Sequence, residues 1–179
     1  MLEENPETVL LYEDEFSLSN TATVGYKWSE KGRQPQIECK QHRRERQTVF
    51  GSLNFDTGQI TVNFAQKGNS GTFKKHLKKV LYEYRDAPKI VMVLDNVSFH
   101  HAKKIEKWLK NHPKLELFFL PPYSPDLNAV ERAWWYMRKK ITHNRYVKSL
   151  KERKALFWKM FSHFQKPNSE LKIVCEINY

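Results

Sequence analysis

Short apolar runs separated by polar turns fill the first third of this chain. Residues 8–14 contain a run of Val, Leu, Leu and Tyr that ends at acidic residues, which predicts a buried strand with Asp14 at its end. Residues 48–55 and 59–65 are rich in β-branched and aromatic residues and are joined by a turn-forming sequence at 56–58. This pattern predicts an antiparallel hairpin, and hence three meandering strands in this region.

The spacing of apolar residues then changes from that of strands to that of helices. Phe73, Leu77 and Val80 fall on one face of a predicted amphipathic helix whose other face carries lysines. A nearly continuous apolar run at 90–94 follows, typical of a strand covered on both faces, and it ends at Asp95. A helix between two strands favours a parallel return. The two strand-ending aspartates should therefore meet at one edge of the sheet, where ligand sites of such sheets lie.

The second half of the chain alternates the same two patterns. A helix is predicted around 102–109, a strand over 115–120 and a helix over 128–141, in which Glu131 lies beside the apolar stripe. A last helix is expected at about 147–164. Its basic residues are interpreted as a solvent-exposed face and include Lys148, Lys151, Arg153 and Lys154. The whole pattern predicts an α/β fold with a mixed five-stranded sheet, three antiparallel strands plus two parallel ones, flanked by helices.

Composition changes this picture mainly through charge. The chain has 179 residues, 40% of them hydrophobic, so we expect 1–179 to form a single domain with a buried core. Its 31 Lys and Arg against 20 Asp and Glu give a net charge of +11, which favours either a nucleic-acid partner or simple solubility. Cys39 and Cys175 are too few for a disulfide framework or a zinc site. No apolar run reaches the roughly 18 residues of a membrane span, so we expect a soluble, intracellular protein with no membrane partner.

Three acidic residues are the leading candidates for chemistry. Asp14 and Asp95 follow apolar strands, and Glu131 lies on a helix that follows the last strand. A cluster of carboxylates can hold two divalent ions about 3.5 to 4 Å apart for phosphodiester cleavage, and Mg²⁺ and Mn²⁺ prefer such oxygen ligands. Clustered carboxylates also repel one another, so without metal their pKa values should be raised.

Each acid also has a structural explanation. Asp14 stands between Glu13 and Glu15, which leaves the choice within this triplet open. Asp95 could simply begin a turn, and Glu131 could complete a capping box with Asn128 three residues earlier. The remaining acid of this region, Asp126, could cap a helix as well.

Several neighbours are candidates for supporting roles. Glu15, Asn96 and His100 lie next to the acids in the sequence, and His100 and His101 could orient a phosphate or a metal-bound water, or be structural. Of two adjacent tryptophans, Trp134 should pack in the core, while Trp135 could lie near DNA or under another element. The polar, basic stretch at 25–47 is expected to be an irregular hairpin or loop. Candidate phosphate contacts, which could equally be solvent-exposed, are Arg43, Arg44, Arg46, Arg138, Lys139 and Lys140.

Four motifs in a fixed order carry a family resemblance. They are YEDE around Asp14, Trp28 with Gly32 and Pro35, VLDNVSFHHA around Asp95, and LPPYSPDLNAVERAWW around Glu131. Between Asp95 and Glu131 lie 35 residues, positions 96 to 130. In this order and spacing, residues 8 to 141 resemble the catalytic domain of DDE transposases of the mariner-type superfamily, most closely the bacterial insertion-sequence branch of the insertion sequence six-thirty type.

The resemblance implies a ribonuclease H-like fold and a metal-binding triad of Asp14, Asp95 and Glu131 that holds two Mg²⁺ or Mn²⁺ ions. It implies cleavage of DNA at transposon ends, followed by attack of the freed 3′ hydroxyl on target DNA, by a homodimer in the bacterial cytoplasm at the nucleoid. Residues 142–179 would be a helical C-terminal extension. The family's N-terminal helix-turn-helix region has no counterpart before the first strand, so recognition of the ends is not expected here. Ala129 replaces a proline that is frequent in the family motif.

Two other functions fit parts of the pattern. A transposase-derived module that binds nucleic acid or dimerises without cutting would keep the basic surface, although all three acids are present. A stand-alone ribonuclease H would share the fold, but the segment PPYSPDLN argues against it.

Overall fold

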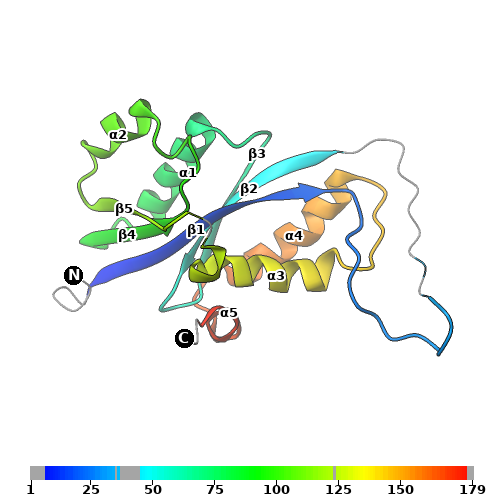
Figure 1. Ribbon diagram of the computed structural model, residues 1–179. Helices are drawn as coiled ribbons and strands as arrows, with labels where there is room; N and C mark the ends of the chain where they lie inside the picture. The colour runs from blue at the N-terminus through cyan, green and yellow to red at the C-terminus, as the bar shows by residue number, and fades with distance from the viewer. Residues whose placement is uncertain (1–6, 35, 37–44, 123, 177–179) are drawn as a thin grey trace.

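A mixed sheet of five strands organises the molecule (Figure 1). The computed structural model describes residues 7–34, 36, 45–122 and 124–176. The strand order is β3-β2-β1-β4-β5. The strands are β1 (Thr8–Ser19), β2 (Arg46–Asn54), β3 (Ile60–Ala65), β4 (Lys89–Leu94) and β5 (Leu115–Phe119). Strands β1, β2 and β3 pair antiparallel with one another, and β4 and β5 run parallel to β1, which confirms the predicted sheet.

Helices cover the two faces of this sheet unequally (Figure 1). On one face lie α1 (Ser70–Glu83) and α2 (Lys103–Leu109), around a core that includes Leu11 and Phe50. The other face carries three α-helices around a core that includes Phe16 and Val49, and the short helix η1 precedes the first of them in the chain. Their bounds are η1 Pro125–Leu127, α3 Ala129–Ile141, α4 Leu150–Phe164 and α5 Ser169–Cys175. The helix α5 was not predicted, because only Leu171 and Cys175 mark its buried face.

Strand β1 is longer than predicted. It continues through Asp14 to Ser19, and Asp14 pairs with Gly51 of β2 rather than ending the strand. The prediction was wrong because it took acidic residues as a strand end. The alternation resumes beyond them, since Phe16 and Leu18 are buried against α3 and α4.

One buried cation also contradicts the prediction. Arg153 of α4, expected on a solvent-exposed face, has no exposed surface. Its guanidinium donates hydrogen bonds to the backbone oxygens of Ile141 (2.8 Å) and Arg145 (2.9 Å). Arg153 thereby satisfies carbonyl groups where α3 ends. The charges of Lys148 and Lys151 do remain exposed.

The segment between β1 and β2 is irregular over its described part, as predicted. Residues 24–34 form no helix or strand, and the side chains of Tyr26 and Trp28 are fully exposed. Pro35, Cys39, Arg43 and Arg44 lie outside the described residues. Among the residues that the structure describes, no helix is long and apolar enough to cross a membrane.

Candidate active site

The register of the sheet brings Asp14 and Asp95 together. Strands β1 and β4 pair in parallel up to Tyr12 and Val93. Each aspartate lies two residues beyond this pair, so the two stand side by side where β4 has ended and β1 continues. The prediction that they meet at one edge is confirmed, although only Asp95 follows the end of its strand.

Asp14 is held from the opposite layer by Trp134 of α3. The Trp134 indole nitrogen donates a hydrogen bond of 3.0 Å to Asp14 Oδ2. Gly51, the cross-strand neighbour of Asp14, leaves the space for the indole ring, because a Cβ there would lie 2.2 Å from Trp134 Cη2. Trp134 is fully buried, as predicted. Its contact with Asp14 was not predicted, because nothing in the local sequence pairs residues 120 positions apart.

Asn128 ties the start of α3 to β1. Its side-chain nitrogen donates a buried hydrogen bond of 2.9 Å to the Glu13 backbone oxygen, and it makes no side-chain capping bond to α3. The capping-box explanation of Glu131 is therefore wrong. Asp126 is not a cap residue either, since the N-caps of η1 and α3 are Ser124 and Asn128.

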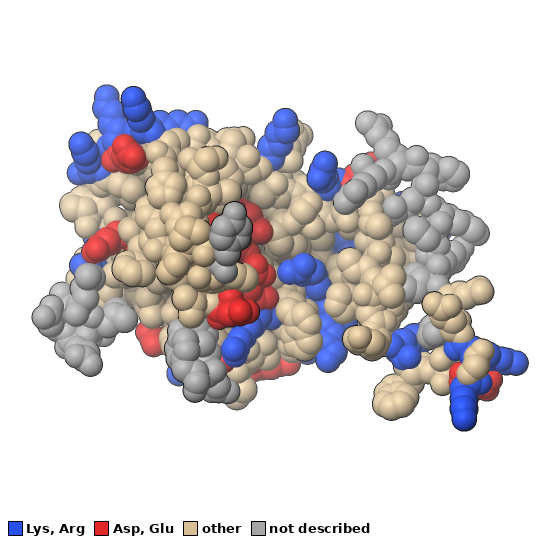
Figure 2. Space-filling model, viewed as in Figure 1, with Lys and Arg blue, Asp and Glu red and all other residues tan. Residues whose placement is uncertain are grey.

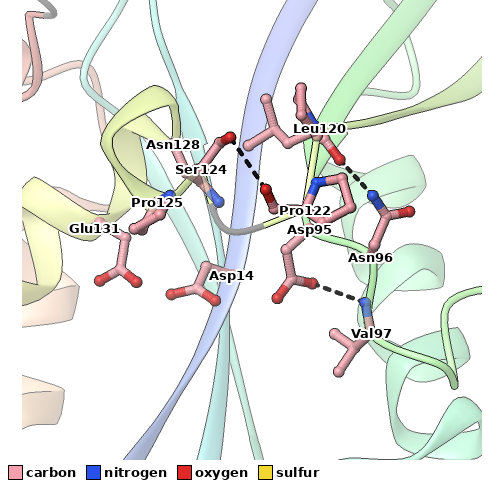
Figure 3. Close-up of a pocket in the computed structure, with 11 residues that line it drawn as sticks. Asp14, Asp95, Asn96, Val97, Leu120, Pro122, Ser124, Pro125, Asn128 and Glu131 are labelled. Atoms are coloured by element: carbon pink, nitrogen blue, oxygen red, sulfur yellow. Dashed lines mark hydrogen bonds between the residues drawn. The ribbon is translucent and has the colours of Figure 1, made fainter.

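The three predicted acids line one pocket of about 530 Å³. Figure 3 shows the carboxylates in a row, with Asp14 between Glu131 and Asp95. Acidic side chains also gather in the middle of the face shown in Figure 2, with Lys and Arg on both sides. The other lining residues are Asn96, Val97, Leu120, Pro121, Pro122, Ser124, Pro125 and Asn128. Glu13 and Glu15 do not line the pocket, so of the three consecutive acids only Asp14 reaches it.

The two aspartates differ in electrostatics. Burial, followed by repulsion from Glu131 and Glu15, raises the pKa of Asp14 well above its ordinary value. The hydrogen bond with His100 is the main reason that the pKa of Asp95 is lowered. The expectation of raised carboxyl pKa values therefore holds for Asp14 and is wrong for Asp95, because a histidine compensates its charge.

The donor set of the pocket suits a hard divalent cation. Its three acids offer only oxygen, and no sulfur or imidazole lines the pocket among the residues described, which matches the preference of Mg²⁺ and Mn²⁺. The repulsion that raises the pKa of Asp14 would be relieved by a bound cation. The residues thus fit such an ion.

Of the accessory candidates, Asn96 lines the pocket, whereas Glu15 and His100 do not. The Asn96 amide nitrogen donates to the Leu120 backbone oxygen, and its Oδ1 lies 3.1 Å from His101 Nε2. Glu15 and His100 lie on the other side of β1, 3.0 Å apart between Oε1 and Nε2. Burial disfavours the charged form of His100, but hydrogen bonds to Asp95 and Glu15 and the nearby charge of Glu13 raise its pKa to about 10.

Basic residues flank the pocket along α3. The Arg138 guanidinium lies 3.8 Å from the Glu131 carboxylate. Lys139 lies over the ring of the exposed Trp135, 4.9 Å from its centre. Lys140 is instead paired with Glu170 of α5 at 3.0 Å. Arg46 is exposed at the start of β2.

A family model described as DDE superfamily endonuclease matches residues 9–154. The chain belongs to this family. A relative, the insertion element IS630 uncharacterized 39 kDa protein of Shigella sonnei, is 30% identical over 141 residues, which cover 79% of this chain and 41% of the relative. The protein y4pE/y4sA of Sinorhizobium fredii is 36% identical over 100 residues, covering 56% of this chain and 71% of that protein. The chain thus spans about two fifths of the length of the Shigella relative.

Solved structures share the fold of this DDE endonuclease chain. A pre-cleavage Mos1 transpososome superposes with a TM-score of 0.69 at 12% identity, over 99% of this chain and 59% of that one. The catalytic domain of Mos1 mariner transposase gives a TM-score of 0.62 at 12% identity, over 97% of this chain and 82% of that one. These likenesses confirm the predicted ribonuclease H-like fold.

Proposed function

We propose that this chain is the catalytic domain of a DDE transposase, which cleaves DNA at transposon ends and joins them to target DNA. One observation carries the proposal: Asp14, Asp95 and Glu131 come from three separate segments and line a single pocket. Family membership and the IS630 relative support the reaction class. We further propose that residues 1–179 act as one domain in which 142–179 is a helical extension.

In this proposal the three carboxylates are metal ligands. Two Mg²⁺ or Mn²⁺ ions bound there would supply activation of the attacking oxygen and stabilisation of the leaving one. The chain's own residues hold the ligands in place. Trp134 orients the Asp14 carboxylate, and the Val97 backbone N–H donates to Asp95 Oδ1 at 3.3 Å. Asn128 fixes the α3 start, and with it Glu131, against β1.

The substrate is DNA, which we place along α3. A second pocket of about 470 Å³ adjoins the acidic one, sharing Asn128 and Glu131, and includes Arg132 and Trp135. Arginines and lysines bind phosphates, and an exposed indole can stack on a base. Trp135 with Lys139 therefore offers a contact for a strand that leaves the pocket.

The active assembly is proposed to be a homodimer at the bacterial nucleoid. The exposed rings of Tyr26 and Trp28 support a partner subunit, because such aromatic side chains are typical of interfaces. Analytical ultracentrifugation with and without transposon-end DNA measures the assembly directly.

Replacement of one acid tests the catalytic proposal. Asp95→Asn is expected to abolish Mn²⁺-dependent nicking of a transposon-end duplex, because it removes a charged ligand. The matched control is Asp86→Asn, an exposed aspartate after α1 whose neighbour is Arg85. Nicking by Asp95→Asn at the wild-type rate would refute the assignment. Salt-dependent DNA binding without any nicking by the wild type would instead favour the non-cutting module.

A further inference from the structure

A closed ionic network lies on the side of β1 opposite the pocket. Glu13 and Glu15 point to this side, since side chains alternate along a strand. There they meet His100, which follows β4 in the loop before α2. The side chains of Glu13 and His100 have no exposed surface, and that of Glu15 is 13% exposed. The side chain of this histidine is therefore out of reach of solvent and of a substrate.

His100 connects Asp95 to β1 through both ring nitrogens. Nδ1 lies 3.2 Å from the Asp95 backbone oxygen and 3.4 Å from Asp95 Oδ1. Nε2 lies 3.0 Å from Glu15 Oε1 and 3.8 Å from Glu13 Oε2. The Asp95 backbone oxygen and the Glu15 carboxylate oxygen accept hydrogen bonds, so both ring nitrogens act as donors, whereas Glu13 Oε2 is too far away for a hydrogen bond.

Packing fixes the plane of the ring. The centre of the His100 ring lies 4.2 Å from that of Phe73 on α1 and 4.7 Å from that of Phe99. The His100 backbone N–H also donates to the Val97 oxygen at 3.0 Å. The loop that carries Asp95 thus cannot shift without moving the imidazole away from its acceptors.

His76 on α1, a second buried histidine on this side of the sheet, has different partners from His100. His76 is also fully buried, yet its Nε2 lies 2.8 Å from the Ser52 hydroxyl, and burial lowers its pKa to about 3. His76 is therefore a neutral packing residue. His100 instead faces Glu13, whose two carboxylate oxygens are buried without a hydrogen-bond partner among the described residues.

We propose that His100 is a positioning residue that ties Asp95 to Glu15 on β1, and so holds Asp95 and Asp14 at the separation that metal binding requires. The inference rests on the proposed function, because it needs these two aspartates to be metal ligands. Its physical basis is that partners behind metal ligands orient them, and that their loss typically weakens metal affinity by about 10- to 100-fold.

Titration of the whole chain with Mn²⁺, monitored by electron paramagnetic resonance, tests the positioning role of His100. His100→Ala is expected to raise the dissociation constant for Mn²⁺ by about 10- to 100-fold, and His100→Asn, which keeps an amide donor near Asp95, should recover part of this loss. The matched control His112→Ala should bind as the wild type does. His112 contacts Trp108 on α2, away from the acids.

The outcomes separate this inference from the proposed function. If Asp95→Asn loses Mn²⁺ binding while folded His100→Ala keeps the wild-type affinity, the positioning role is refuted and the active site stands. If Asp95→Asn binds Mn²⁺ like the wild type, both fail. Should His100→Ala not fold, Glu15→Ala replaces it. Weakened Mn²⁺ binding by that variant supports the role, whereas unchanged affinity overturns it.

Discussion

The two faces of strand β1 place neighbouring acidic residues in opposite environments. On one face of β1, Asp14 opens into the pocket beside Glu131, and their repulsion contributes to its raised pKa. On the other face, Glu13 and Glu15 are enclosed with His100. The open face leaves a charge imbalance that a cation can satisfy. On the closed face His100 offsets the charge of Glu15, while burial and the nearby Glu15 raise the pKa of Glu13 well above its ordinary value. Because side chains alternate along a strand, the pleat of β1 decides which of its consecutive acidic residues can line the pocket.

The largest difference is expected between Asp14→Asn and Glu13→Gln. The first should lower Mn²⁺-dependent nicking by more than about 100-fold and the second by about 10-fold or less, because Glu13 acts only through His100. Initial rates of nicking at saturating Mn²⁺ measure both. Equal losses would mean that the two faces do not differ in function.

The close contact behind Asp14 gives the next effect. Gly51→Ala places a Cβ 2.2 Å from Trp134 Cη2, which should cost about 3 kcal/mol of unfolding free energy and also slow nicking by displacing the donor to Asp14. The control is Gly68→Ala, where the nearest atoms lie 3.7 Å from the added Cβ. Gly68→Ala should change the free energy of unfolding by no more than about 0.5 kcal/mol. Urea unfolding at pH 7 compares them, and equal stability of the two variants would contradict the packing argument.

A further effect is the pH dependence of stability on the closed face. The pKa of His100 is raised from 6.5 to about 10. A raised histidine pKa stabilises the fold fully below the ordinary value and loses this contribution as pH rises through the folded value. The stability difference between wild type and His100→Asn should therefore shrink by on the order of a few kcal/mol between pH 6.5 and pH 10. Unfolding curves across this range measure it. A constant difference would show that His100 is not charged in the folded protein.

Much of the architecture could be predicted from local pattern. The hairpin of β2 and β3, the basic helix α1 and the parallel strand β4 all follow the expected periodicity. Predictions failed where a residue contradicts its local pattern. Acidic residues inside β1 concealed its continuation, and the charge of Arg153 concealed its burial against the end of α3. The two-residue apolar face of α5 was too short to indicate a helix.

The sequence by itself determined the order of the strands and of the α-helices before α5, because these depend on spacing along the chain, and the order of its motifs singled out Asp14, Asp95 and Glu131 through the family resemblance. Only the tertiary structure decided how these acids are held. Trp134 reaches Asp14 over Gly51, Asn128 reaches the backbone of Glu13, and His100 joins Asp95 to Glu15. Each contact joins segments about 85 to 120 residues apart. The periodicity of a sequence indicates which side of its own helix or strand a residue faces. Which residue it contacts on another helix or strand depends on how the helices pack against the sheet.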